Sequence, residues 1–437
     1  MAGGLGTRMR SSVPKHLHPL LGRRVIDWVI DAAREAGADP IVVVASPDSV
    51  DAYEGMRVAV QEQPLGTGDA VASARDALAG FEGNLLVLDA AAPLLTAAHL
   101  AELVAEHERQ GAAVTILSFE ASRPLPYGRI VRADDGSVEA IVEDRDASPV
   151  QREIPELNSS TYAFSAGSLW TALEKLDPHN AQGELYLTDA IAHLVADGRR
   201  AAAWCCPDEL APLGINTRAE LAVAASELRD RINYAHMLAG VTIVDPRTAW
   251  IDHGVTLEAD AVVHPFTVLR GSTTVAARAE FGPHAVAVDA SIGEAAIVGP
   301  FCYLRPGTVL EAGAKAGTFV EIKQSRIGAG AKVPHLSYIG DAEIGEGSNI
   351  AAGNVTANYS HEPGRAKSKT TIGKNVRTGV DNTFVAPVTV GDDAWLWAGT
   401  VVTDDVPPGS LAGFPPRQET KEGWVYQRGK DADGGDD

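Results

Sequence analysis

The sequence contains very little cysteine, and this limits how the protein can be held together. Only Cys205, Cys206 and Cys302 occur among its 437 residues, and two of them are adjacent. So few cysteines, placed in this way, argue against a disulfide framework and against a four-ligand zinc site. We therefore interpret all three as packing residues.

Long apolar runs and positive charge are also scarce. No apolar run reaches the roughly 18 residues of a membrane span, and the amino terminus lacks the basic and apolar regions of a secretory signal. Lysine and arginine number 37 against 58 acidic residues, which gives a net charge of -21. This charge would repel nucleic acid over most of the surface, although glycine-rich backbone and a few local cations can still hold a small phosphate. We expect a cytoplasmic protein with no membrane or nucleic-acid partner.

The first half of the chain has an α/β rhythm. A chain of this length is expected to form at least two domains. Short Val/Ile/Leu runs predict buried strands at 40–46, 84–90 and 112–119, and an amphipathic pattern predicts a helix at 97–111. Alternation of this kind is typical of α/β domains.

From about residue 249 the rhythm changes to a period of six. An aliphatic or similar residue recurs at each sixth position, with Gly, Asn or Asp close by, in three runs. The runs are Ile292, Val298, Leu304, Leu310, Ala316, Ile322; Ile327, Val333, Ile339; and Ile372, Thr378, Phe384, Val390, Leu396, Val402. This period is typical of a parallel β-helix, whereas chance spacing explains three separate runs poorly. The segment 220–240 before it predicts a linking helix.

A glycine-rich stretch, AGGLGTRMRSSVPKHL, lies at the start of the chain. Its glycines allow successive backbone N–H groups to point at phosphates, and Arg8 and Lys15 add positive charge. A glycine-rich turn alone is equally compatible with a purely structural role. The combination of G-x-G-T-R with a following Pro-Lys is more specific.

Several later segments extend this pattern in a fixed order. They are QEQPLGTGDAV, YGRIV, IVEDRDAS, PELNSSTYAF, NAQGELYLTD and GINTRAEL. With them the chain resembles, over nearly its whole length, the GlmU family of bifunctional N-acetylglucosamine-1-phosphate uridylyltransferases and glucosamine-1-phosphate N-acetyltransferases. The resemblance implies an α/β nucleotidyltransferase (Rossmann-like) domain over 1–218, a linker helix over 219–248 and a left-handed parallel β-helix of hexapeptide repeats over 249–408. Residues 409–437 would form a carboxy-terminal segment with a disordered acidic tail.

The resemblance also implies a site for UTP and N-acetylglucosamine 1-phosphate in the first domain. The positions that match the family are Gly3, Gly4, Arg8 and Lys15 for the triphosphate, Gln61, Gly66 and Thr67 for the uracil, and Gly128, Glu143 and Asn158 for the amino sugar. One departure concerns the strand that normally precedes the glycine loop. Met1 stands directly before that loop, so the first strand is missing or the start is misassigned.

A second departure concerns the Mg²⁺ site that the resemblance implies. In the family motif Gly-Asp-x-Pro-Leu the Asp binds Mg²⁺ together with the Asn of the G-[VI]-N segment. Aligned on Pro93, the Asp falls at Ala91, while the Asn is present as Asn216. Asp89 could face the same side of a strand, but roughly 6 to 7 Å away along it. We therefore expect impaired uridylyl transfer, with a rearranged metal site that uses Asp89 as the alternative.

The β-helix carries the second set of candidate residues. Acetyl transfer to an amine needs a base for the amine proton, and His335 is the candidate base among several polar residues. The resemblance assigns His335 as the general base of acetyl transfer from acetyl-CoA to glucosamine 1-phosphate, in a homotrimer whose subunits share the site. It implies Arg305, Lys323, Tyr338 and Asn349 for the acceptor sugar, and Ala352, Asn358, Tyr359, Ala398 and Arg417 for acetyl-CoA. The coenzyme side departs from the family at Val380, where a Ser is expected, and at the bulky Trp395 and Trp397.

Three functions are consistent with these residues. The first is an enzyme of UDP-N-acetylglucosamine biosynthesis, and so of a cell-wall peptidoglycan precursor, with an intact acetyltransferase and an impaired uridylyltransferase. The second is a fully bifunctional enzyme with a rearranged metal site. The third is a non-catalytic, sugar-nucleotide-binding paralogue, which Val380 and the two tryptophans would favour if they block the coenzyme.

Overall fold

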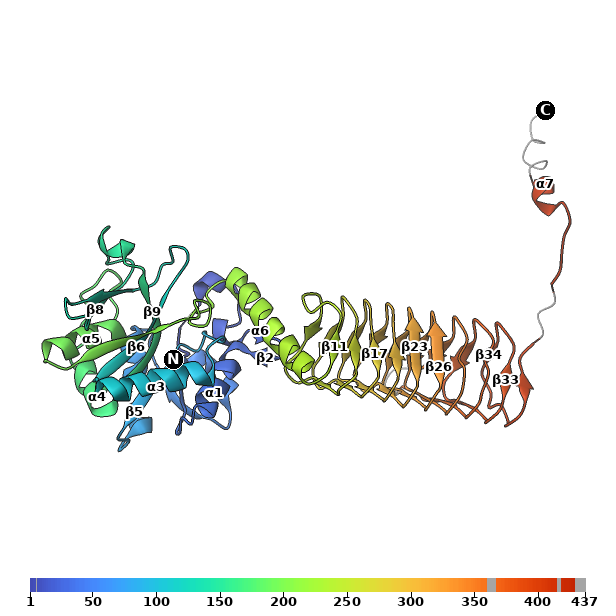
Figure 1. The fold of residues 1–437 in the computed structure, drawn as a ribbon. Coiled ribbons are helices and arrows are strands. Elements are labelled where there is room, and N and C mark those ends of the chain that lie inside the picture. Colours follow the sequence, from blue (N-terminus) through green and yellow to red (C-terminus); the bar gives the residue numbers. More distant parts are fainter. Residues whose placement is uncertain (5, 360–366, 415–417, 429–437) are drawn as a thin grey trace, which may run out of the picture. The chain divides into compact units, whose positions relative to one another are not determined.

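The computed structural model describes residues 1–437 except 5, 360–366, 415–417 and 429–437. The chain divides into two compact units, Met1–Arg231 and Ile232–Asp437, here called the amino-terminal unit and the β-helix unit. Figure 1 shows the first unit in blue to green and the second in yellow-green to red. The boundary falls within helix α6 (Arg218–Leu238), which confirms the helix predicted at 220–240. Most of the acidic tail predicted to be disordered lies outside the described residues. No described helix combines the length and apolar character needed to cross a membrane.

The amino-terminal unit is an α/β domain. Its helices are α1 (Val25–Glu35), α2 (Thr67–Ala72), α3 (Ala97–Gln110), α4 (Ala166–Leu173) and α5 (Leu187–Ala196). Its strands are β1 (Pro19–Leu20), β2 (Arg23–Arg24), β3 (Val42–Ala45), β4 (Arg57–Val60), β5 (Asn84–Val87), β6 (Val114–Glu120), β7 (Arg129–Arg132), β8 (Val138–Val142), β9 (Glu156–Ser165) and β10 (Ala201–Cys206). The three predicted strands correspond to β3, β5 and β6, and the predicted helix 97–111 corresponds to α3.

Strand β9 lies inside the largest sheet of this unit and pairs with three other strands. The sheet has the order β10-β6-β9-β7-β8, and β5 also pairs with β9. Strand β10 runs parallel to β6, whereas β5, β6 and β7 run antiparallel to β9. Helix α3 packs near this sheet; it begins at Thr96, whose side chain accepts a hydrogen bond from the His99 N–H, and ends at Gly111 in the left-handed conformation.

Strands β3 and β4 form a separate parallel pair. Met1 and Ala2 connect this pair to the segment after β5 by three backbone hydrogen bonds: Ala2 N–H to Val44 O (2.7 Å), the Met1 ammonium to Leu88 O (2.8 Å) and Ala90 N–H to Met1 O (3.1 Å).

A cavity of about 400 Å³ continues from Met1 between β3 and β5. Most of its lining is apolar, and Val43, Leu86 and Trp170 are among the contributing residues. The amino-terminal unit therefore has an empty, mainly apolar space between two strands that do not pair with each other.

In the β-helix unit, short parallel strands stack into three sheets (Figure 1). In most coils a strand pairs with one 17 or 18 residues later, as in the pairs Leu304↔Ile322 and Val309↔Arg326. One sheet contains β11 (Thr242–Ile243), β14 (Val262–Val263), β17 (Glu280–Phe281), β20 (Ile297–Val298), β23 (Lys315–Thr318) and β26 (Lys332–His335). The next contains β12 (Trp250–Ile251), β15 (Val268–Arg270), β18 (Val286–Val288), β21 (Tyr303–Leu304), β24 (Glu321–Lys323), β27 (Tyr338–Gly340), β29 (Val355–Ala357), β31 (Thr383–Val385) and β34 (Val401–Val402). The third contains β13 (Thr256–Leu257), β16 (Thr274–Val275), β19 (Ser291–Ile292), β22 (Val309–Leu310), β25 (Arg326–Ile327), β28 (Ala342–Ile344), β30 (Thr370–Ile372) and β32 (Val388–Val390). A further pair, β33 (Trp395–Leu396) and β35 (Leu411–Ala412), lies near the carboxyl end, and the short helix α7 (Trp424–Arg428) follows.

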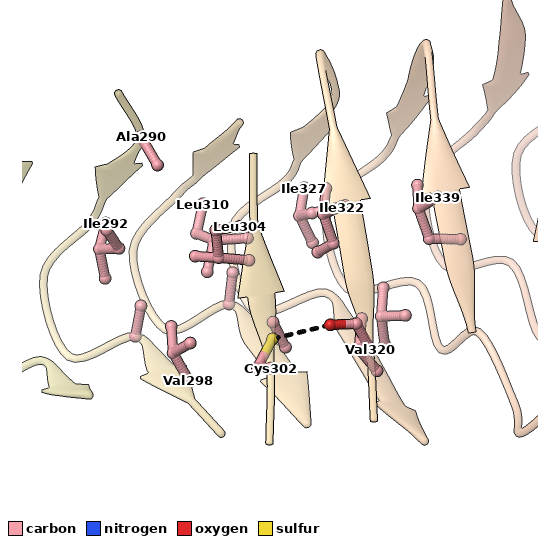
Figure 2. Close-up of a cluster of buried hydrophobic side chains, with 14 of the residues drawn as sticks. Ala290, Ile292, Val298, Cys302, Leu304, Leu310, Val320, Ile322, Ile327 and Ile339 are labelled. Carbon is pink, nitrogen blue, oxygen red and sulfur yellow. Dashed lines mark hydrogen bonds between the residues drawn. The ribbon is translucent and has the colours of Figure 1, made fainter. Parts of the chain in front are cut away.

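The sixth-position residues form the core of the β-helix. Ile292, Leu310 and Ile327 point inward and stack from coil to coil in Figure 2. All predicted repeat positions are buried except Thr378, which is half-buried. This confirms the expected parallel β-helix.

The three cysteines do not all have the same role. Cys302 is buried and its thiol donates to Val320 O at 3.1 Å (Figure 2), and Cys206 is buried as well. Cys205 is exposed on β10, so the interpretation as a packing residue is wrong for this cysteine. The reason is its position on the strand, because neighbouring side chains of a strand face opposite sides of the sheet.

An exposed ladder of rings runs along one corner of the β-helix. We call it the aromatic ladder; it consists of Phe266, His284, Phe301 and Phe319. Successive rings stack with centroid distances of 4.6, 5.0 and 5.3 Å. All four residues have positive φ, between 53° and 58°. Because solvent reaches about half of each phenylalanine, these rings do not belong to the core.

Candidate active sites

The glycine loop of the amino-terminal unit lies against Gln61. A Cβ added to Gly3 would come within 2.3 Å of the Gln61 Oε1, so only glycine fits there without a shift. The Gln61 amide donates to Gly66 O (3.0 Å) and to the Asp69 carboxylate (2.8 Å). The Thr67 hydroxyl accepts the Leu187 N–H at 3.0 Å. The structure therefore groups the predicted triphosphate loop with the predicted uracil residues. Gly4 and Arg8 are exposed at this loop.

The predicted amino-sugar residues also come together. Asn158 N–H donates to Gly128 O at 2.8 Å, and a Cβ at Gly128 would lie 3.6 Å from the Glu143 Oε2. Burial raises the pKa of Glu143, although the Thr188 hydroxyl donates to its carboxylate at 3.2 Å. These residues form one polar group, in which Gly128 and Asn158 are buried and Glu143 is half-buried.

Lys15, Asp89 and Asn216 meet at the end of the glycine loop. The Lys15 Nζ lies 3.3 Å from the Asn216 Oδ1 and 3.7 Å from the Asp89 Oδ2. All three side chains are partly buried. Burial opposes ionisation of Asp89, but the pKa of this carboxyl is lowered, first by the Lys15 ammonium and the Ala91 N–H and further by the nearby Met1 ammonium and His16.

Ala91 has different surroundings. It is fully buried and belongs to an apolar cluster with Met9, Leu94 and Ile215. Its backbone, rather than its side chain, faces the polar group, since its N–H donates to the Asp89 Oδ1 at 3.0 Å.

Asp89 and Asn216 suit Mg²⁺ only when the phosphates of a bound substrate supply further oxygen ligands. Within the described part of the chain, no three His, Cys, Asp or Glu side chains come together as a metal-binding group. Mg²⁺ is commonly bound by one or two carboxylates plus substrate phosphates. Asp89 and Asn216, beside a loop suited to phosphates, match that requirement.

Tyr127 is a site residue that the sequence analysis did not assign. Its hydroxyl accepts the Gly214 N–H at 3.1 Å, and burial raises its pKa to about 12. It thereby ties the YGRIV segment to the segment that carries Asn216. Tyr127 belongs to the YGRIV motif found in the sequence, but nothing in the sequence showed that this motif lies beside the segment that carries Asn216.

In the β-helix unit, His335 is the last residue of β26 and is exposed. It lies at a corner of the β-helix, here called the His335 corner. The corner continues in later coils, because Gly353 N–H donates to His335 O (3.4 Å) and Asp381 N–H donates to Ala352 O (2.9 Å). Gly399 N–H in turn donates to Val380 O at 2.8 Å. Three of the residues assigned to the coenzyme side, Ala352, Val380 and Ala398, therefore follow His335 along one corner. Asn349 comes before that corner in its coil, and its backbone forms isolated parallel β-bridges with Lys332 and Arg377.

The predicted sugar-phosphate residues lie on the sheet that follows this corner. Arg305 pairs with Glu321 at 2.8 Å. The Tyr338 hydroxyl and the Asn358 amide converge over Gly340, where an added Cβ would lie 2.5 and 2.7 Å from them. Gly340 thus leaves room for two polar side chains.

Lys367 is a second residue that the sequence analysis left without a role. The contact with Lys367 is the main reason why the pKa of Lys323 is lowered, and Asp341 acts in the opposite direction. Two ammonium groups side by side, close to Arg305, are suited to an anion of more than one charge. Lys367 lies 44 residues after Lys323, so its position in the chain did not show that the two side chains are close.

The remaining coenzyme residues are less closely grouped. Tyr359, Trp395 and Trp397 are exposed by 69%, 61% and 40%, so the indoles remain accessible in the isolated chain. Arg417 lies outside the described residues.

Comparisons with known proteins agree with this architecture. The model of the MobA-like NTP transferase domain matches residues 1–180. The chain is 46% identical over 456 aligned positions to the bifunctional protein GlmU of Mycobacterium bovis strain BCG / Pasteur 1173P2, covering 98% of this chain and 92% of the relative. It is also 46% identical over 457 positions to the bifunctional protein GlmU of Corynebacterium efficiens, with 98% and 93% covered. With this identity over nearly the full length of both chains, and with an NTP transferase unit followed by a parallel β-helix, the chain belongs to the GlmU family.

Proposed function

We propose that the β-helix unit transfers the acetyl group of acetyl-CoA to the amine of glucosamine 1-phosphate. The observation that carries this proposal is a cationic group near the exposed His335. Arg305 directly follows β21 and Lys323 lies in β24, both in the sheet that comes after the His335 corner, and Lys367, which lies in no strand, contacts Lys323. A phosphate held by these cations would place a sugar beside the Tyr338 hydroxyl. This matches the binding roles that the resemblance implies for Arg305, Lys323, Tyr338 and Asn349.

In this reaction His335 accepts a proton from the amine as its nitrogen attacks the thioester carbonyl. The C–N bond forms, the C–S bond breaks, and the proton passes from His335 to the departing thiolate. A positioned base of this kind contributes roughly 100-fold to 10,000-fold in rate. Ala352, Asn358, Tyr359, Ala398 and Arg417 are the residues assigned to the coenzyme.

We further propose that the active form is a homotrimer. The aromatic ladder is an exposed apolar strip on the same corner as His335, and Leu336, which follows His335, is 62% exposed. Burying such a strip against a second copy of the chain is favourable. A neighbour at this corner would cover the space between the His335 corner and the sugar-phosphate sheet.

For the amino-terminal unit we propose binding of UTP and N-acetylglucosamine 1-phosphate. Impaired uridylyl transfer remains our prediction from Ala91, since this position provides no carboxylate. One geometric observation favours the alternative of a fully bifunctional enzyme: Asp89 and Asn216 lie around the same Lys15 ammonium. If Mg²⁺ binds, these two side chains would hold it with the phosphates, and the ion would supply neutralisation of the triphosphate charge.

Thiol release from acetyl-CoA tests the acetyl transfer directly. We expect turnover with glucosamine 1-phosphate and much weaker turnover with glucosamine, because the cationic group requires the phosphate. Lys323→Ala should raise the KM for the phosphorylated sugar at least tenfold. Absence of thiol release with either acceptor would favour the non-catalytic paralogue.

A further inference from the structure

We propose that Asp89 is the carboxylate through which the amino-terminal unit holds a divalent cation. The role that the family motif gives to position 91 would then belong to a residue two positions earlier in this chain. This inference rests on the proposed binding of UTP by the same unit.

A positive charge already lies close to both oxygen donors. The Asp89 carboxylate and the Asn216 amide oxygen come from segments far apart in the sequence, yet both lie within 4 Å of the Lys15 Nζ. A carboxylate and an amide oxygen are typical ligands of Mg²⁺ and Mn²⁺. The same two atoms can therefore serve a divalent cation when the Lys15 ammonium turns toward a phosphate.

The Asp89 carboxylate is also held in position. Its Oδ1 accepts the Ala91 N–H at 3.0 Å, and Ile215 N–H donates to Ala91 O at 2.7 Å. A Cβ added to Gly214 would lie 3.1 Å from the Asp89 Oδ2, tighter than ordinary van der Waals contact. The absence of a side chain at Gly214 thus makes room for the second carboxylate oxygen next to the Asn216 segment. The Asp89 side chain is 23% exposed, so a ligand can reach it.

Position 91 is unsuited to a metal-binding carboxylate in this chain. Ala91 is fully buried among Met9, Leu94 and Ile215. A carboxylate introduced there would enter an apolar cluster, and burial of an unpaired charge is strongly unfavourable. In this chain, position 89 and not position 91 directs a carboxylate at the Lys15 ammonium, which Asn216 also contacts.

Mn²⁺ binding, followed by electron paramagnetic resonance with UTP present and the sugar phosphate absent, tests the assignment without relying on turnover. We expect Asp89→Asn to weaken Mn²⁺ binding at least tenfold. Gly214→Ala should weaken it as well, because the added methyl displaces the carboxylate. Asp197→Asn is the matched control, since it also breaks an Asp–Lys pair, with Lys175, but on the surface; it should bind Mn²⁺ like the parent protein.

Three results would count against the proposal or its basis. Equal Mn²⁺ affinity of the parent and Asp89→Asn, with UTP bound to both, would overturn the assignment of Asp89. An Ala91→Asp variant that gains Mn²⁺ affinity with no loss of melting temperature would overturn it too, because we expect lower stability and no gain. If UTP binds to none of the folded proteins, with or without Mn²⁺, the proposed nucleotide site fails and this inference fails with it.

Discussion

His284 stacks on Phe301 with ring centroids 5.0 Å apart and ring planes 7° from parallel, although the two residues belong to successive coils. Both have positive φ, of 53° each. Bulky residues in the left-handed region cost about 1 to 3 kcal/mol each and persist where the surroundings or a function maintain them. Strained, exposed and regularly spaced rings are the expected features of a contact surface.

We therefore expect Phe301→Asp to weaken self-association and to lower acetyl transfer with it. A charge in the middle of the aromatic ladder would have to be desolvated in the trimer, which is costly. Sedimentation velocity at micromolar concentration should show trimers for the parent and smaller species for the variant. Tyr426→Asp changes an exposed ring elsewhere and should leave association intact. A parent protein that sediments as a monomer would refute the trimer and the shared site.

His335→Ala should lower acetyl transfer roughly 100-fold to 10,000-fold while the β-helix stays folded. The reason is loss of the base that takes the amine proton. Thiol release measures the rate, and an unchanged melting curve shows that the fold is kept. His264→Ala, which removes a histidine paired with Glu280 in an earlier coil, is the control. Full turnover of His335→Ala would assign the base to another group.

The cavity beside Met1 predicts a large gain from an added strand. Five or six apolar residues placed before Met1 would run between β3 and β5, and the new amide N–H could keep the hydrogen bond to Leu88 O. Each large side chain buried contributes about 1.5 to 3 kcal/mol, so we expect a rise of about 5 °C or more in the melting temperature.

A Gly/Ser extension of the same length is the control for the added strand. It can pair its backbone but fills no apolar space, so it should raise the melting temperature little. If both extensions melt at the parent temperature, the two strands flanking the cavity need no partner between them.

His16 should make stability depend on pH. It is buried, its ring lies 6.2 Å from that of Tyr53, and its Nε2 has no hydrogen-bond partner among the described residues. Burial first, and then the charge of Lys15, lowers its pKa from 6.5 to about 4. Between pH 6.5 and 4, His16 binds a proton in the unfolded chain but not in the folded protein. The free energy of unfolding therefore decreases as pH falls from 6.5 to 4.

The decrease from His16 amounts to at most roughly 3 kcal/mol. His16→Phe should remove it, whereas His179→Asn, at a highly exposed histidine, should keep it. Urea unfolding at several pH values between 4.5 and 7 measures the slope. Equal slopes for parent and His16→Phe would show that other groups cause the pH dependence.

The parallel β-helix could be predicted from the sequence because the repeat positions coincide with the buried side chains. The six-residue period marks inward positions such as Leu304 and Ile322, and both are fully buried. Runs of β-branched and leucine residues likewise marked β3, β5 and β6. In these elements the local pattern and the tertiary fold select the same residues.

The polar sites were predicted less completely, because they depend on contacts between distant segments. Spacing along a strand suggested that Asp89 was too far from the metal position, yet the chain has left the strand by residue 89 and the carboxylate lies near Lys15. Lys367 and Tyr127 were visible in the sequence, but their neighbours became clear only in the fold. Likewise, only the fold showed that Cys205 and Cys206 face opposite sides of β10, so that one is exposed and the other buried.

The stacking of coils in the β-helix implies cooperativity in one dimension. The described strands of each coil pair with strands of the neighbouring coils, so such a structure frays from its ends and is most resistant in the middle. Ala398 lies near the carboxyl end, Ala352 nearer the interior, and His335 deeper still along the same corner. Hydrogen exchange should therefore be fastest around Ala398 and slower toward His335. Opening at this end would loosen the coenzyme side of the corner while the coil that carries the base is still closed.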